Sequence, residues 1–138
     1  MTVIESLKTY LENLLPGITI DLDFSSGNIN TAGIFSNPND EYTARYIDGS
    51  YTRREHKTLF LTLSTTTDKK RKENAQTLEE LTETIESAAQ NGNLPAMEQG
   101  KQCLGLEVTG SAYIEVSDDG GSTAGYALSV AIDYLKEN

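Results

Sequence analysis

Apolar residues at the start of the chain recur at the spacing of a helix. Thr2 and Glu5 stand at the positions of a capping box, in which each side chain bonds the other residue's backbone N–H. Pro16-Gly17 is a stop signal. The pattern therefore predicts an N-terminal helix with one buried face. Its apolar stripe comprises Val3, Ile4, Leu7, Leu11, Leu14 and Leu15.

A second and longer helical pattern lies in the middle of the chain. We expect this helix to begin at Asp68 or Lys69 and to end near Gln90, before the stop signal Asn91-Gly92. The opposite side of the helix is rich in Glu and Lys, so that side is expected to face solvent. Its apolar stripe comprises Ala75, Leu78, Leu81, Thr82, Ile85 and Ala88.

Elsewhere apolar and polar residues alternate, which is typical of strands with one buried face. Three or four strands are expected between the helices and three after them. The polar segment 50–57 (SYTRREHK) is expected to be a loop or an exposed strand end. The expected strands cover residues 18–24, 31–35, 42–46, 58–63, 104–108, 112–116 and 124–134.

The turns between these strands indicate the fold class. Residues 25–28, 37–40 and 118–121 are rich in Ser, Asn, Asp, Gly and Pro, and favour hairpin connections. We therefore expect one α+β domain over residues 1–138, with a mainly antiparallel sheet and both helices packed on one face. The last strand has small and polar residues on its other face, which is either solvated or packed against another subunit.

Composition removes several functional classes. The 138 residues contain 21 acidic and 11 basic side chains, for a net charge of −10, which opposes binding to DNA or to anionic membranes by bulk electrostatics. A single Cys excludes an intramolecular disulfide framework. The sequence has no transmembrane-length apolar run and no signal-peptide pattern. We therefore expect a protein of the cytoplasm.

Candidate catalytic chemistry is sparse. His56 lies among charged neighbours without a nucleophile signature, and we interpret it as a solvated loop histidine. Cys103 has no second ligand at metal-binding spacing and is expected to be a small buried residue. Glu79, Glu83 and Glu86 are expected on the exposed helix face. No phosphate-binding loop is present, so we expect no cofactor and no metal, and an enzyme is the least favoured class.

Two groups of side chains are candidates for a protein–protein interface. Tyr and Arg are enriched at interface centres, and both are concentrated in residues 42–54. Four consecutive bases oppose the dipole at the start of the second helix, which fits either an acidic partner or a solubilising helix start. The candidate residues are Tyr42, Arg45, Tyr46, Tyr51, Arg53 and Arg54, together with Lys69, Lys70, Arg71 and Lys72.

The order and length of these elements resemble small tail-terminator and minor capsid proteins of long-tailed phages and of prophages in Gram-positive bacteria. The resemblance rests on Val3–Gly17, on Thr58–Leu63 leading into Asn74–Ala89, and on the alternating strand Tyr126–Leu135. It implies a non-enzymatic subunit of a ring, usually a hexamer, that caps the tail tube and joins it to the head connector. Its implied locations are the host cytoplasm during assembly and the head–tail junction of the virion.

The resemblance also implies its partners: other copies of the chain, the major tail protein and head connector proteins, with DNA passing through the ring unbound. Six subunits at −10 each would carry about −60 before ions bind, which would repel DNA. The alternative is a small monomeric or dimeric α+β module that binds a ligand or regulates a partner. That alternative requires a discrete apolar pocket with a few converging polar groups.

Overall fold

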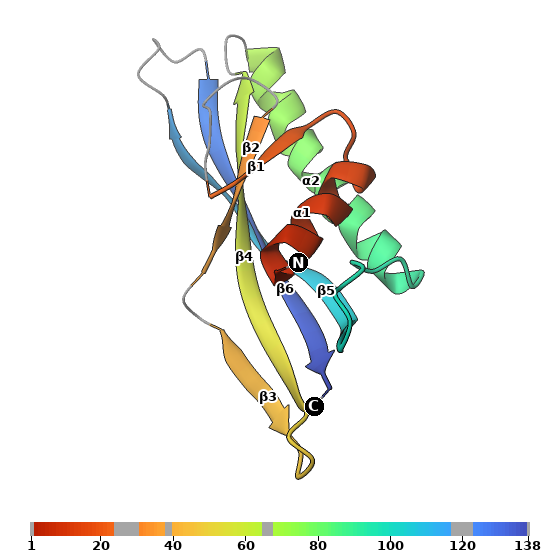
Figure 1. Cartoon of the computed structure of the whole chain (residues 1–138). Helices are drawn as coiled ribbons and strands as arrows, with labels where there is room; N and C mark the ends of the chain where they lie inside the picture. The colour runs from red at the N-terminus through yellow and green to blue at the C-terminus, as the bar shows by residue number, and fades with distance from the viewer. Residues whose placement is uncertain (1, 24–30, 38–39, 65–67, 117–122, 138) are drawn as a thin grey trace.

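The structure, a computed structural model, describes residues 2–23, 31–37, 40–64, 68–116 and 123–137, without the side chains of residues 68, 71 and 112–116. Two helices and six strands make one α+β fold, which confirms the expected class (Figure 1). In chain order the elements are α1 (Val3–Leu14), β1 (Thr19–Leu22), β2 (Thr31–Ser36), β3 (Glu41–Arg45), β4 (Tyr51–Ser64), α2 (Asp68–Gln90), β5 (Lys101–Val116) and β6 (Thr123–Lys136).

The strands form one sheet in the order β1-β2-β4-β6-β5, and β3 pairs with β4 beyond the end of β2. All pairs are antiparallel except β1 and β2, which are parallel. The expectation of a hairpin between these first two strands is therefore wrong. The turn predicted at residues 25–28 lies outside the described residues.

Both helices cover the same face of the sheet (Figure 1). Antiparallel register places Leu59 opposite Leu128 and Leu61 opposite Tyr126, so these side chains point to the same face. That face and the two helices enclose one hydrophobic cluster. The helices contribute the buried side chains of Val3, Leu7, Tyr10, Leu11, Leu78, Leu81 and Ile85.

Both helices begin as the sequence predicts. Thr2 caps α1, and its side chain accepts the Glu5 backbone N–H at 3.2 Å, while the Glu5 carboxylate returns to the Thr2 backbone at 3.3 Å. In α2 the buried position near the start belongs to Asn74, and Ala75 is exposed. The Asn74 amide donates to the Ser64 carbonyl at 2.8 Å, so a polar anchor replaces the expected apolar contact.

The two strands expected over 104–108 and 112–116 are one strand, β5. Gly110 interrupts the apolar alternation in the sequence, but in the structure it only marks one of three bulges in the pairing with β6. A bulge inserts an extra residue and bends a strand without ending it. The residues described after α2 therefore form two strands and not three.

Residues 51–57 of the polar segment 50–57 form the first half of β4, where a loop or an exposed strand end was expected. Strand β4 pairs with β6 along all fourteen of its residues and holds β2 and then β3 on its other edge. Between β2 and β3, the Asn37 N–H donates to the His56 carbonyl at 3.0 Å, and the His56 N–H donates to Asp40 Oδ1 at 2.9 Å. The hairpin β3–β4 extends beyond the helices, at the end where the C-terminus lies (Figure 1).

Candidate protein interface

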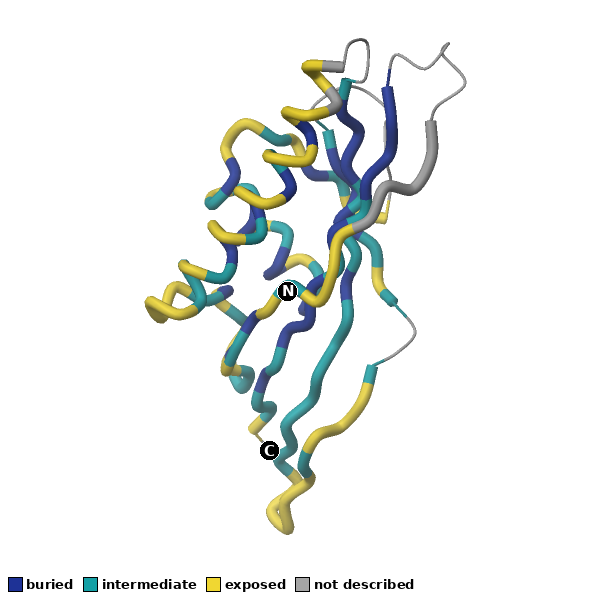
Figure 2. The backbone as a smooth tube through the Cα atoms, turned by 180° about the vertical axis from the view of Figure 1, so that it is seen from behind, coloured by how far each residue is buried: buried dark blue, intermediate teal, exposed yellow. Residues whose placement is uncertain are grey.

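A tight turn forms the tip of the β3–β4 hairpin. The Tyr46 N–H donates to the Ser50 carbonyl at 2.9 Å, and the Gly49 N–H donates to the Tyr46 carbonyl at 3.1 Å. Gly49 has φ +91°, a conformation that glycine adopts at little cost. The Ser50 backbone and hydroxyl bond the Asp48 carboxylate and lower its pKa. This turn leaves Ile47 fully exposed. Figure 2 shows the tip of the hairpin in the colour of exposed residues.

A bulge in β3 decides which side chains meet on the hairpin. Simple alternation would place Arg45 on the face opposite Tyr42, but the register shifts between Tyr42 and Ala44. Tyr42 pairs with Arg53 and Arg45 with Tyr51, so all four lie on one face. The Tyr42 and Tyr51 rings meet edge-to-face at 5.1 Å between centroids. The Arg45 guanidinium lies 3.9 Å from the Tyr42 ring centroid, and that of Arg53 lies 4.9 Å from it.

The exposed side chains of β3 and of the hairpin turn form an apolar and cationic surface. Tyr42, Tyr46 and Ile47 are exposed by 44%, 52% and 109%, and Arg45 is also exposed. Within the described part of the chain, Arg45 stacks on Tyr42 and forms no ion pair with a carboxylate. A cation without an acidic partner beside exposed aromatic rings is typical of a surface that binds another protein. We call Tyr42, Arg45, Tyr46 and Ile47 the hairpin patch.

A buried ionic group holds the base of the hairpin. Lys57 has only 3% of its side chain exposed and contacts Glu55 Oε1 at 2.8 Å, while the Tyr134 hydroxyl donates to Glu55 Oε2 at 2.6 Å. Burial alone would raise the pKa of Glu55, but these hydrogen bonds and the charges of Lys57 and Arg53 lower it below its ordinary value. Burial and the Glu55 carboxylate raise the pKa of Tyr134. Sequence reasoning missed this group because Tyr134 lies 79 residues from Glu55 in the chain, and because the segment that holds Glu55 and Lys57 was expected to be a loop or an exposed strand end.

Arg54 does not join the hairpin patch. It alternates with Arg53 along β4 and therefore lies on the opposite face of the sheet, where it bonds the Glu107 carboxylate and lies 3.4 Å from Asp133. Burial and the nearby Glu107 raise the pKa of Asp133, and Arg54 opposes this effect. The guanidinium of Arg54 therefore forms its ion pairs with carboxylates of its own chain.

The basic cluster at the start of α2 is separate from the hairpin. Lys69, Lys70 and Lys72 are exposed, and the side chain of Arg71 lies outside the described part of the structure. The start of α2 and the hairpin lie at opposite ends of the molecule (Figure 1). The two groups of candidate residues therefore cannot form one continuous surface.

The candidate catalytic residues lie in β-strands. His56 is half-buried in β4 opposite Ala131, and not in a loop as expected. Cys103 is buried in β5, as predicted, and burial raises the pKa of its thiol to about 11. Among the described residues, no three His, Cys, Asp or Glu side chains are placed to hold a metal ion. No described helix has the length and apolar character needed to cross a membrane.

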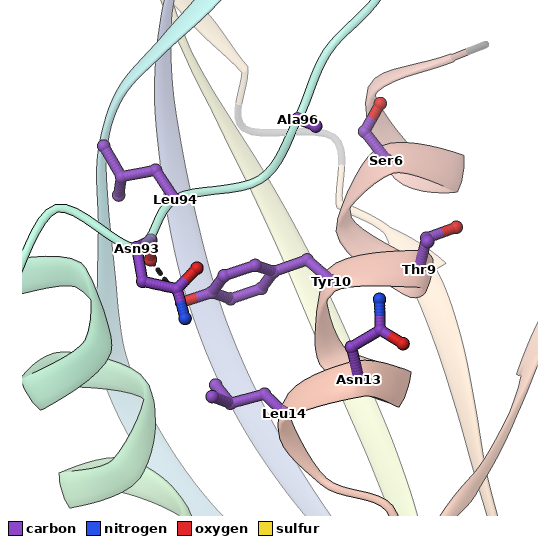
Figure 3. A pocket seen from close by; sticks show the side chains of 8 residues that line it. All are labelled: Ser6, Thr9, Tyr10, Asn13, Leu14, Asn93, Leu94 and Ala96. Atoms are coloured by element: carbon purple, nitrogen blue, oxygen red, sulfur yellow. Dashed lines mark hydrogen bonds between the residues drawn. The ribbon is translucent and has the colours of Figure 1, made fainter.

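A pocket of about 310 Å³ lies between α1 and the segment that follows α2 (Figure 3). Its wall combines apolar side chains with uncharged polar ones, and the Tyr10 hydroxyl donates to the Asn93 carbonyl at 2.8 Å across it. This volume is near the lower end for small-molecule sites. The lining residues are Ser6, Thr9, Tyr10, Asn13, Leu14, Asn93, Leu94 and Ala96.

Comparison with known proteins yields a likeness of fold. No protein-family model matches the chain, and no curated protein sequence matches it. The chain is similar to a chain in a solved structure described as the virion of a native gene transfer agent (GTA) particle, with a TM-score of 0.56. The identity is 10%, and the match covers 98% of this chain and 99% of that one. At an identity of 10%, this likeness shows a shared fold and nothing further.

Proposed function

We propose that this chain is a non-enzymatic structural subunit of a phage-like virion. In the finer form of the proposal it is a tail terminator or minor capsid subunit that caps the tail tube and joins it to the head connector. The observation that carries the proposal is the likeness, over nearly the whole length of both chains, to a chain of a gene transfer agent virion.

The hairpin patch supports an assembly role. Tyr42, Arg45, Tyr46 and Ile47 expose apolar and cationic surface on an arm that projects beyond the rest of the fold (Figure 2). Exposed aromatic and apolar side chains gathered at one place are a feature of protein-binding surfaces. The proposed partners are further copies of the chain in a ring, the major tail protein and the head connector.

Net charge supports the passage of DNA without binding. At −10 per subunit, a ring would repel DNA overall, because DNA affinity depends on Lys and Arg side chains that neutralise phosphates. The proposed locations follow from the same role: the bacterial cytoplasm during assembly and the head–tail junction of the finished virion.

Deletion of the gene from the genome that encodes it tests the proposal. Electron microscopy of the resulting particles is expected to show unjoined heads and tails. Tails of uncontrolled length indicate a tail terminator, whereas unjoined tails of normal length indicate another minor capsid component. Joined particles of normal shape and length would contradict the virion role. Complementation with the wild-type gene should restore joined particles.

A double variant separates this role from catalysis. His56→Ala with Cys103→Ser removes both candidate catalytic side chains and is expected to complement the deletion as the wild type does. Loss of complementation by a double variant that folds normally would favour an enzyme.

A second candidate function is that of a small ligand-binding module, favoured by the pocket beside α1. Its mixed uncharged lining would suit a small neutral ligand with a few hydrogen-bonding groups. A thermal-shift screen would reveal such a ligand as a concentration-dependent rise in Tm, because a ligand that binds only the folded state stabilises it. Replacing Ala96 in the pocket wall by Trp should abolish that rise.

A further inference from the structure

A second surface of the molecule carries the acidic side chains that the hairpin patch lacks. A groove of about 480 Å³ runs between the end of α1 and the exposed side of α2. Leu14 and Ala88 give it a partly buried apolar floor, and Glu80 and Glu83 stand exposed along it. No hydrogen bond or ion pair involves the Glu83 carboxylate in the described part of the chain. We call this surface the acidic groove.

The charges of the two surfaces are opposite. Residues 41–54 of the hairpin hold three bases and two acids, for a net charge of +1. Residues 73–90 of α2 hold five acids and no base, for a net charge of −5. In a chain of net charge −10, the hairpin, like the segment Lys69–Lys72, has a net positive charge, whereas residues 73–90 of α2 are strongly acidic. Charge complementarity of this kind steers association and sets its register.

The two surfaces also match in their apolar parts. Ile47 is fully exposed at the tip of a turn that hydrogen bonds hold in shape. The lining of the groove offers Leu14 and Ala88 as apolar contacts for this side chain. It also offers the carboxylates of Glu80 and Glu83 as acceptors for the Arg45 guanidinium and the Tyr46 hydroxyl. An apolar anchor surrounded by polar partners is the usual arrangement of a binding hot spot.

The hairpin cannot reach the groove of its own chain, because it projects away from the helix layer (Figure 1). We propose that the hairpin patch of one copy docks in the acidic groove of a second copy. The contact is heterologous, because it joins two different surfaces, and such contacts close into rings or extend into filaments. The proposal rests on the proposed ring assembly and names the residues that would build it.

Charge reversal on either side of the contact tests the proposal. Sedimentation velocity over a concentration series of the full chain is expected to show self-association of the wild type. Arg45→Glu and Glu83→Arg should each raise the dissociation constant at least about tenfold, because like charges would then face each other. Lys8→Glu and Glu73→Arg make the same changes of charge outside both surfaces and outside the basic cluster of α2, and should leave it unchanged.

Mixing the two variants gives the sharper test. The Arg45→Glu chain keeps a normal groove, and the Glu83→Arg chain keeps a normal hairpin. An equimolar mixture can form one native contact between Arg45 and Glu83, and in the other contact the two reversed charges also attract each other. Mixing should therefore restore the association that each variant loses alone, with a 1:1 heterodimer as its smallest species.

Three results would overturn the proposal: a wild type that stays monomeric up to its solubility limit, variants that associate like the wild type, or a mixture without heterodimer. None of these results decides the virion role, because that role is tested separately by the particles of the deletion strain. If deletion leaves normal particles but the heterodimer forms, the contact stands and the virion role fails.

Discussion

The ring of Phe60 on β4 lies against the backbone of Gly125 on β6, on the sheet face that the helices leave open. Phe60 pairs directly with Ala127, so Gly125 is its diagonal neighbour across the two strands. A Cβ atom on Gly125 would lie 2.3 Å from Phe60 Cζ, closer than any real contact. The absence of a side chain at Gly125 is thus what lets the aromatic ring cover the strand.

Gly125→Ala is therefore expected to destabilise the fold by about 1–3 kcal/mol, because the Phe60 ring must move from its place. Chemical denaturation measures this difference. Gly110→Ala is the matched control, because an added Cβ there meets nothing within 4 Å, and its cost should be close to zero. In a Phe60→Ala background the cost of Gly125→Ala should largely disappear, and a full cost in that background would contradict the packing argument.

The buried ion pair of Lys57 with Glu55 is expected to stabilise the base of the hairpin. Lys57→Met keeps the length of the side chain but leaves the Glu55 carboxylate without its buried partner, so we expect a loss of about 3 kcal/mol. Lys8→Met breaks the exposed Lys8–Glu12 pair and should cost no more than about 0.5 kcal/mol. Equal losses in thermal or urea unfolding would argue against a special role for Lys57.

The Glu55 carboxylate should make stability depend on acid. Its pKa is lower in the folded chain than in the unfolded chain, so its contribution is present above the unfolded pKa and is lost as the pH falls through the folded pKa. Glu55→Gln cannot titrate. Between about pH 5 and about pH 3, the unfolding free energy of the wild type should fall more steeply than that of the variant. Parallel curves would show that Glu55 keeps an ordinary pKa.

Periodicity predicted the elements whose apolar residues face one side only. The bounds of α2 and most of β6 follow from such patterns, as does the capping box of Thr2 and Glu5. The prediction from periodicity failed where hydrogen bonds between strands outweigh the local choice of residues. The polar start of β4 is a strand because β3 and β6 satisfy its backbone on both edges, and Gly110 is absorbed by a bulge.

The candidate interface was predictable in composition but not in geometry. The density of Tyr and Arg located the hairpin, whereas the bulge after Tyr42 decided that Arg45 lies on its face and ordinary alternation turned Arg54 away. A one-residue shift of register reverses the face of every side chain after it, and no local pattern reports such a shift. The acidic groove depends on how α1 packs against α2, which periodicity does not specify.

The Cys103 thiol gives a last prediction, on reactivity. Its Sγ donates to the Gly105 carbonyl at 3.5 Å, and burial raises its pKa to about 11. Only the thiolate reacts with iodoacetamide, so at about pH 8 the folded chain should be alkylated on the order of a hundredfold more slowly than the unfolded chain. Leu104→Cys in a Cys103→Ser background is the control, because position 104 is half exposed and its thiol should react rapidly. Alkylation of native Cys103 at the rate of that control would show an accessible thiol and would reopen the case for a catalytic cysteine.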